Sequence, residues 1–440
     1  MFGFEHYLRL AAALTVATLL GALVFHPGAG KNYARQAAAL NPETTPAAAR
    51  ACVRDAPLLK AAFAPMGDIL SVSPLGEATA PGEQVPAPAI RLNTRKGKTA
   101  FERRVTSALT PAKADIIAIE RRTIRDSEGG AARETWSVRL AVCQDITVGY
   151  DDLDEIEPSI LARAGGLAAF QEVGTPDHLA AITMIRLRQG EKIGAADGFD
   201  VLLEDRAAAP APLDRPERYQ SDAYAEGAAI SASPAVLKAI ASDASRLQCP
   251  LEYLPPSMAA EWKSKLGDAW GMRRAKGENA CRTALIDIPG AAQGVWFTDA
   301  SHNGRTSKVS AIALAPDTID PGRMIFALHG RMRSLVADMV GLNPMLEEAR
   351  EDAARGFLTF EQSDGRINAP FDKVRAGETY CYEGLRANFV GPRINAIILL
   401  AIEPGGTAPL MRVEARGDVM RCIDLAEPWS FTGAETTFYR

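Results

Sequence analysis

The sequence has little histidine and lacks the short motifs of metal and nucleotide sites. It holds five histidines, none in an H-x-H or H-E-x-x-H pattern, so the common zinc-enzyme signatures are absent. Its six cysteines are too far apart for C-x-x-C zinc or redox motifs. The G-x-S-x-G, G-x-G-x-x-G and G-x-x-x-x-G-K motifs are also missing. Motifs therefore predict no catalytic residue, no metal ligand and no cofactor.

Positive and negative charges are nearly balanced. The chain carries 49 Lys and Arg against 54 Asp and Glu, a net charge of −5, which does not favour nucleic-acid binding. Arg91, Arg95, Lys96 and Lys98 lack interleaved aromatic residues and are interpreted as an ordinary surface patch. The 440 residues, 47% hydrophobic and 23% charged, are typical of two or three globular domains.

Only one long apolar run occurs, LAAALTVATLLGALVF at residues 10–25. It is shorter than the ~20 apolar residues of a spanning helix and fits the apolar part of a secretory signal. Glu5 offsets Arg9 and no clear cleavage site follows, so an uncleaved anchor stays open. We predict that residues 1–30 are a signal peptide or N-terminal anchor. The body would then be periplasmic or otherwise extracytoplasmic, and would meet the membrane only through this segment.

Export would permit disulfide bonds between the cysteines. Six cysteines allow fifteen pairings, and buried free thiols remain an alternative. Pairing neighbours along the chain is preferred, and each closed loop would stabilise the fold by ~3–4 kcal/mol. The predicted bonds are Cys249–Cys281, Cys381–Cys422 and, by remainder, Cys52–Cys143.

The chain divides into segments of different pattern, and the fold class predicted is mainly β with some α. Runs such as ADIIAIERRTI and TWSVRLAVC alternate in polarity as antiparallel strands do, whereas one helix is expected near residues 344–355. The predicted parts are a helical or linker region (31–62), a β domain (63–205), a Pro-rich linker (206–218), a Cys-containing mixed segment (219–300) and a C-terminal antiparallel β domain (301–440).

Isolated polar residues give weak signals on their own. His178 in TPDHL is interpreted as a solvated loop histidine, His302 as part of a turn, and His329 as a strand-end residue. The acidic run DDLDEIE (151–157) lacks the glycine and spacing of an EF-hand and is interpreted as a solvated turn.

Several blocks resemble a known family. PMGDILSVSPLG (65–76), VGYDDL (148–153) and LRQGEKIGAADGFDVLLED (187–205) resemble the lysostaphin/LytM-type metallopeptidase fold, in the divergent form found in a class of exported bacterial proteins. The tail of those proteins resembles CPLEYL (249–254), CRTALIDIPGAAQGVWF (281–297) and DGRINAPFDKVRAGETYCYEG (364–384), with Cys422. The resemblance implies a LytM-like antiparallel β domain followed by a conserved tail.

The zinc ligands that the resemblance implies are absent. The family's Y-x-H-L turn reads YDDL at 150–153, with Asp152 where histidine belongs. Its H-x-H strand reads FDV at 199–201, and the first-ligand block at 80–92 has Glu83 but no histidine. A zinc hydrolase needs three protein ligands and an open position for water. The resemblance therefore implies the fold without its activity.

The sequence predicts an exported, envelope-associated, non-catalytic protein. Its degenerate LytM-like domain would bind or scaffold peptidoglycan, or envelope proteins that act on peptidoglycan. The candidate groove contains Tyr150, Asp152, Asp200 and Asp205.

Two alternatives stay open. A hydrolase with a relocated site would combine His178, His302 or His329 with the carboxylates of Asp152, Asp200 and Asp205. A small-ligand or sugar-binding protein would instead use Trp296, Phe297 and Tyr380 as stacking platforms, although core aromatics are the stronger interpretation.

Overall fold

The computed structural model describes residues 46–78, 87–95, 97, 103–124, 132–213, 234–276, 280–281, 287–298, 311–329, 357–387, 393–403 and 409–440. The predicted leader, the helix expected near 344–355, Glu83 and His302 lie outside these residues. Among the helices that can be described, none is long and apolar enough to cross a membrane.

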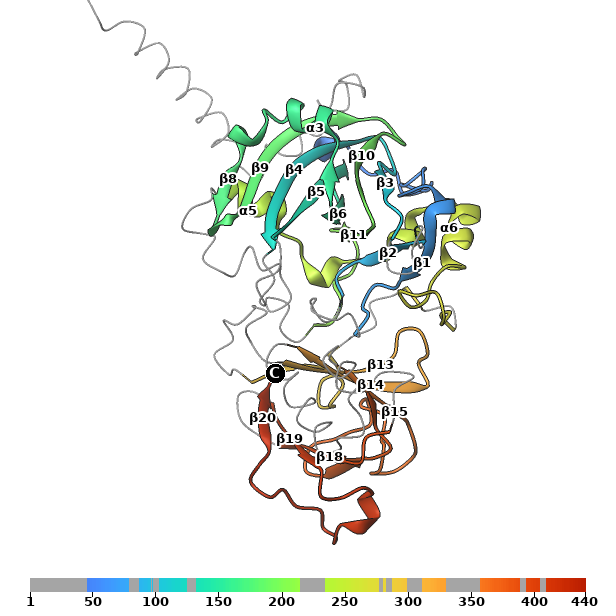
Figure 1. The fold of residues 1–440 in the computed structure, drawn as a ribbon, viewed down its shortest axis with the longest axis vertical. Coiled ribbons are helices and arrows are strands. Elements are labelled where there is room, and N and C mark those ends of the chain that lie inside the picture. Colours follow the sequence, from blue (N-terminus) through green and yellow to red (C-terminus); the bar gives the residue numbers. More distant parts are fainter. Residues whose placement is uncertain are drawn as a thin grey trace, which may run out of the picture.

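Antiparallel sheets dominate the structure, which confirms the mainly β prediction. The first large sheet has eight strands in the order β1-β2-β11-β6-β5-β4-β9-β8 (Figure 1). Its strands are β1 (Ile69–Ser73), β2 (Ile90–Thr94), β4 (Ala114–Ile124), β5 (Arg133–Cys143), β6 (Ile146–Leu153), β8 (Gln171–Val173), β9 (Thr175–Leu187) and β11 (Gly198–Asp205). The runs ADIIAIERRTI and TWSVRLAVC are therefore strands β4 and most of β5, as predicted.

A smaller sheet and three helices complete this sheet body, whose described residues lie between 46 and 281. The smaller sheet, ordered β3-β10-β7, consists of β3 (Thr106–Leu109), β10 (Lys192–Ala196) and β7 (Glu155–Ile156). The helices are α3 (Pro158–Arg163), α5 (Pro234–Ile240) and α6 (Pro256–Lys263). Helix α6 adds the fully buried Trp262 to the main core, against Phe63 at 5.6 Å between ring centroids.

The two faces of the eight-stranded sheet differ because side chains alternate along each strand. On β5, Val138 and Leu140 enter the main core, whereas Ser137 and Arg139 project from the opposite face. Helix α5 covers part of that second face at Ala118 of β4 and the neighbouring β9. The rest of the second face carries the charged residues described below.

A second sheet of nine strands forms a half-barrel, whose described residues lie between 287 and 440. Its order is β16-β18-β19-β20-β12-β13-β14-β15-β17. The end strands β16 and β17 are joined by residues 383–385, so the sheet curls until its two edges approach each other (Figure 1). The strands are β12 (Gly294–Phe297), β13 (Ala311–Pro316), β14 (Arg323–His329), β15 (Phe357–Glu361), β16 (Thr379–Tyr382), β17 (Arg386–Ala387), β18 (Ile397–Glu403), β19 (Leu410–Arg416) and β20 (Thr436–Tyr439).

Aromatic rings fill the half-barrel. Phe326 packs edge-on against Phe371 and Tyr382, with ring centroids 4.9 and 5.1 Å apart. Side chains alternate between the two faces of a strand, so the neighbours of each inward-pointing residue point outward. Ile325 and Ala327, for example, belong to a separate outer cluster. The interior is therefore a packed core.

The sheet body and the half-barrel contact each other through that outer cluster. Ala78 and Ala244 of the sheet body pack against the outer face of β12, β13 and β14. Arg273 pairs with Asp317 beside this contact, and Nζ of Lys276 lies 2.8 Å from Asp320. Figure 1 shows the two parts one above the other, joined at this interface.

All three predicted disulfides are present; Cys52–Cys143 and Cys381–Cys422 each attach a peripheral segment to a strand, whereas Cys249–Cys281 joins two segments outside the sheets. The Cα–Cα distances are 5.3, 5.5 and 6.0 Å for Cys52–Cys143, Cys249–Cys281 and Cys381–Cys422. The last bond holds the C-terminal segment, with Trp429, against the outside of β16 and β18. Three disulfides are typical of proteins that fold outside the reducing cytoplasm.

Candidate functional site

The positions that match the family's H-x-H pair lie in the core of the sheet body. Phe199 and Val201 have no exposed surface. Tyr150 packs against Phe199 at 5.9 Å between ring centroids and donates a 2.6 Å hydrogen bond to the carbonyl of Leu109. Burial raises the pKa of the Tyr150 phenol well above its usual value. Tyr150 and its neighbours thus fill space with apolar contacts and do not line a polar groove.

Asp152 and Asp200 do come together, but on the opposite face and around a cation. Nη2 of Arg91 lies 2.7 Å from Asp152, and Nη1 lies 3.1 Å from Asp200. Asp152 has a φ of +64°, which turns its carboxylate toward Arg91 and Arg133. Arg91 belongs to the 80–92 block in which the resemblance places the first ligand. Three blocks distant in sequence therefore converge on a guanidinium group.

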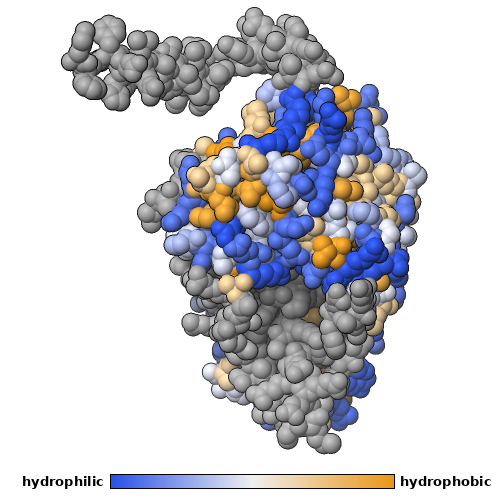
Figure 2. Space-filling view, turned by 45° about the horizontal axis from the view of Figure 1, so that its top comes forward, coloured by the Kyte–Doolittle hydropathy of each residue, from blue (hydrophilic) through white to orange (hydrophobic). Residues whose placement is uncertain are grey.

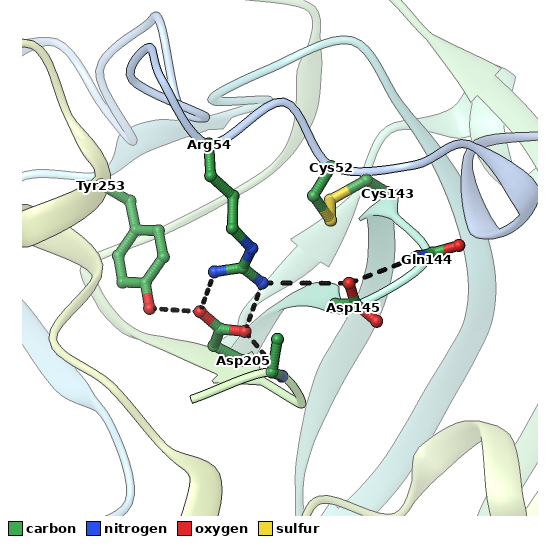
Figure 3. The surroundings of a disulfide bond; sticks show 8 residues. Cys52, Arg54, Cys143, Gln144, Asp145, Asp205 and Tyr253 are labelled. Atoms are coloured by element: carbon green, nitrogen blue, oxygen red, sulfur yellow. Dashed lines mark hydrogen bonds and ion pairs between the residues drawn. A yellow bond between two sulfur atoms is a disulfide. The ribbon is translucent and has the colours of Figure 1, made fainter. Parts of the chain in front are cut away.

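Asp205 lies apart from these residues, at the far end of β11. It accepts hydrogen bonds of 2.8 and 2.7 Å from Arg54 and one of 2.8 Å from the Tyr253 hydroxyl (Figure 3). Burial disfavours ionisation of Asp205, but the bonds from Arg54, Tyr253 and the Ala207 N–H outweigh it and lower its pKa to about 2. The Cys52–Cys143 disulfide holds the segment that carries Arg54, so Asp205 fastens that segment to the sheet.

A row of paired charges crosses the second face of the eight-stranded sheet from β9 to β2. Nε2 of His178 lies 2.9 Å from Glu120, whose other oxygen lies 3.6 Å from Arg139. Arg139 in turn contacts Asp151 at 2.6 Å. Asp151 is the cross-strand neighbour of Asp200. We call this row the charged belt; its members are Arg91, Glu120, Arg139, Asp151, Asp152, His178 and Asp200.

Glu120 and Arg139 form the buried centre of the belt. Their side chains are 2% and 7% exposed. Burial alone would raise the pKa of Glu120, but the hydrogen bond with His178 and the charges of Arg122 and Arg139 lower it to about 2. The carboxylate is therefore ionised and held by several partners, as a buried charge requires.

Toward β2 the belt becomes accessible to solvent. The side chains of Asp151, Asp152, Asp200 and Arg91 are between 20% and 28% exposed. On the face of the molecule shown in Figure 2, hydrophilic residues of the described chain alternate with apolar patches. This accessible end offers carboxylates and a guanidinium in fixed positions.

Sequence reasoning missed the centre of the belt and misplaced two of its parts. His178 lies within strand β9 and is paired with Glu120, so its interpretation as a solvated loop residue is wrong. The run 151–157 is not a solvated turn either, since β6 continues to Leu153 and β7 follows it. The signal available was Arg139, a charge inside the otherwise apolar run of β5.

The residues proposed as stacking platforms are core residues. Trp296, Phe297 and Tyr380 are 1%, 9% and 5% exposed. The indole N–H of Trp296 donates to the carbonyl of Ala292 at 2.8 Å, and the guanidinium of Arg440 lies 4.1 Å from its ring centroid. None of these rings is available to stack on a sugar, which counts against the small-ligand alternative and agrees with the interpretation of them as core aromatics. His329 ends strand β14, the strand-end position predicted for it.

Comparisons with known proteins give no match. No protein-family model matches the chain, and neither a curated protein nor a solved structure does. Within the described residues, no group of three or more His, Cys, Asp or Glu side chains is arranged to hold a metal ion. The LytM-type resemblance therefore stays a prediction from the sequence.

Proposed function

We propose that this protein is an exported, non-catalytic component of the cell envelope whose LytM-like β domain binds peptidoglycan, or a protein that acts on it. One observation carries the proposal: Phe199 and Val201, at the positions of the family's zinc-binding strand, are completely buried among apolar side chains. A catalytic zinc needs polar ligands and an open coordination position for water, and buried apolar residues supply neither.

The remaining family positions support the same conclusion. Arg91 forms an ion pair with both Asp152 and Asp200, so a permanent cation occupies the place where they converge. A guanidinium can anchor two carboxylates but cannot activate water as a metal does. These residues fix the position of three strands, which suits a binding surface better than a hydrolytic centre.

Export is supported by the three disulfides together with the apolar run at residues 10–25. We place the folded part in the periplasm or an equivalent compartment, behind a signal peptide or N-terminal anchor. In that compartment a protein meets peptidoglycan directly.

The accessible end of the charged belt suits a short peptide carrying both amino and carboxylate groups. Arg91 already donates to Asp152 and Asp200 through its two Nη atoms. A carboxylate has further lone pairs and each Nη carries a second N–H, so the aspartates can accept from amino groups and Arg91 can donate to a carboxylate as well. Stem peptides of peptidoglycan carry both kinds of group. Because the belt residues are already fixed by one another, little conformational entropy is lost when such a peptide binds.

Co-sedimentation with purified peptidoglycan sacculi tests this proposal. We expect the oxidised full chain to pellet with sacculi, and the Asp152→Asn/Asp200→Asn variant to pellet at least several-fold less. Asp418→Asn is a matched control, because Asp418 is an exposed carboxylate paired with Arg416 on the half-barrel. Equal pelleting of all three proteins, or none of the wild type, would contradict the proposal.

A second candidate, a hydrolase with a relocated site, is favoured by the 2.9 Å contact between His178 and Glu120. A histidine oriented by a buried carboxylate is a common general base. Release of soluble fragments from sacculi by the wild type, abolished in His178→Gln, would establish this alternative. Under the non-catalytic proposal neither protein releases fragments.

A further inference from the structure

The loop at residues 266–275, beside β1, presents apolar side chains to solvent. Trp270 is 51% exposed and Met272 is 74% exposed. The loop is well fixed, because the carboxylate of Asp268 accepts hydrogen bonds from the N–H groups of Met272 and Arg273 at 2.8 and 3.1 Å. A structured turn thus holds two apolar side chains in solvent, although contact of apolar surface with water is unfavourable.

One cation packs on Trp270, and others adjoin the loop. The guanidinium of Arg103 lies 4.6 Å from the ring centroid of Trp270. Lys265 directly precedes the loop and Arg274 belongs to it. Burial and the nearby charges of Arg95 and Arg274 lower the pKa of Lys265, against the opposing effect of Glu261. We call this surface the Trp270 tip; it consists of residues 266–275 with Arg95, Arg103 and Lys265.

The side-chain hydrogen bonds of three of these cations go to backbone carbonyls, which carry no formal charge. Arg103 donates to the carbonyl of Thr94 at 2.8 Å, Lys265 to that of Ile69 at 2.8 Å, and Arg274 to that of Lys265 at 3.1 Å. Across the described part of the chain, no carboxylate lies within ion-pair distance of Arg95, Arg103, Lys265 or Arg274. The tip therefore combines exposed apolar surface with excess positive charge.

We propose that the Trp270 tip docks on the surface of an anionic lipid bilayer. Tryptophan and methionine side chains can enter the boundary between headgroups and acyl chains, where the amphipathic indole ring is favoured. Lysine and arginine near such a surface each strengthen binding through the negative surface potential. An anionic polymer would satisfy the cations but would leave Trp270 and Met272 in water. The proposal does not depend on peptidoglycan binding.

Trp270 is also a specific reporter of this docking. The chain has five tryptophans, and the other four are between 0% and 8% exposed; they are Trp136, Trp262, Trp296 and Trp429. A change in emission wavelength or in quenching by acrylamide will therefore report mainly on Trp270. The apolar run at residues 10–25 contains no tryptophan, so its own binding to lipid leaves this signal unaffected.

The experiment mixes the full chain with vesicles of phosphatidylcholine alone or of phosphatidylcholine with phosphatidylglycerol. We expect a blue shift of emission and protection from acrylamide only with phosphatidylglycerol, both reversed by high salt. Unchanged emission with both vesicles would overturn the proposal. So would binding to soluble dextran sulfate without a blue shift on vesicles, since it would assign the cations to an anionic polymer.

Variants that retain Trp270 distinguish the contribution of charge to vesicle binding from that of apolar contact. Arg95→Gln/Arg274→Gln should weaken binding to anionic vesicles, measured by the Trp270 blue shift, by about tenfold or more, because two of the attracting charges are lost. Met272→Ser should weaken it several-fold at unchanged salt dependence. Met420→Ser, which removes a 62% exposed methionine from the half-barrel, should bind like the wild type. Equal Trp270 blue shifts for all these proteins at every lipid concentration would contradict docking through the Trp270 tip.

Discussion

The guanidinium of Arg139 occupies the space that a side chain at Gly149 would need. A Cβ atom at Gly149 would lie 2.9 Å from Nη1 of Arg139 and 2.7 Å from Cγ of Leu202. Both distances are shorter than ordinary van der Waals contact. The glycine of β6 thus lets the buried cation of β5 lie flat across the sheet and reach Asp151.

Gly149→Ala should therefore destabilise the sheet body by ~2 kcal/mol, since the added methyl group displaces Arg139 from its partners. Urea denaturation of the oxidised protein measures the change in the free energy of unfolding. Gly67→Ala is the matched control, because a Cβ there meets no atom within 4 Å. Equal stability of the two variants would show that Arg139 has room to move.

Glu120→Gln should destabilise the protein by about 3 kcal/mol at neutral pH. The pKa of Glu120 is lowered from 4.5 to about 2, which means that its surroundings stabilise the ionised carboxylate over the neutral acid by ~3 kcal/mol. The neutral amide would leave the buried Arg139 with one carboxylate partner, Asp151, in place of two. Chemical denaturation measures the loss, and Glu172→Gln, at an exposed position on β8, should change stability by less than ~0.5 kcal/mol. A small effect of Glu120→Gln would mean that the belt centre contributes little.

The lowered pKa of Asp205 predicts how the stability of the fold changes at acidic pH. Its pKa is about 2 in the folded protein and 3.8 when unperturbed, so its contribution is fully present above about pH 4 and is lost as the pH falls toward 2. Asp205→Asn should cost about 2 kcal/mol at neutral pH and flatten the stability curve between pH 4 and 2. Thermal unfolding across this range measures both effects. A variant curve parallel to that of the wild type would contradict the assignment.

The Cys52–Cys143 disulfide closes the longest loop, with 91 residues of sequence separation against 32 and 41 for the others. Replacing both cysteines by serine should lower the free energy of unfolding by ~4–5 kcal/mol, and Cys381→Ser/Cys422→Ser by ~4 kcal/mol. Denaturant titration with and without reductant measures both. The opposite order would show that native packing, not loop entropy, governs the effect.

The sequence predicted the local features of the fold well. Alternation in ADIIAIERRTI and TWSVRLAVC predicted strands, and the preference for pairing cysteines in sequence order, one of fifteen possible pairings, agrees with all three bonds. These features depend on neighbouring residues or on a simple pairing rule. The curling of nine strands into a half-barrel depends on contacts between distant residues, such as Phe326 with Tyr382, which local patterns do not encode.

The candidate site was predicted less completely for the same reason. Asp152 and Asp200 do lie together, but their partner Arg91 is about 60 and 110 residues away in sequence. Glu120 and His178 are paired only because β4 and β9 are neighbours in the sheet. Which face each charge occupies also depends on β-bulges, such as the one between Ile116 and Ala118, that shift the alternation.

Binding without hydrolysis is tested most directly by one measurement on sacculi. The oxidised full chain is incubated with purified sacculi and zinc, the pellet is assayed for protein, and the supernatant is analysed for muropeptides by chromatography. We predict protein in the pellet and no muropeptides above the level of a sacculi-only control. Muropeptides that increase with protein concentration, or a protein that remains entirely in the supernatant, would contradict the proposed function.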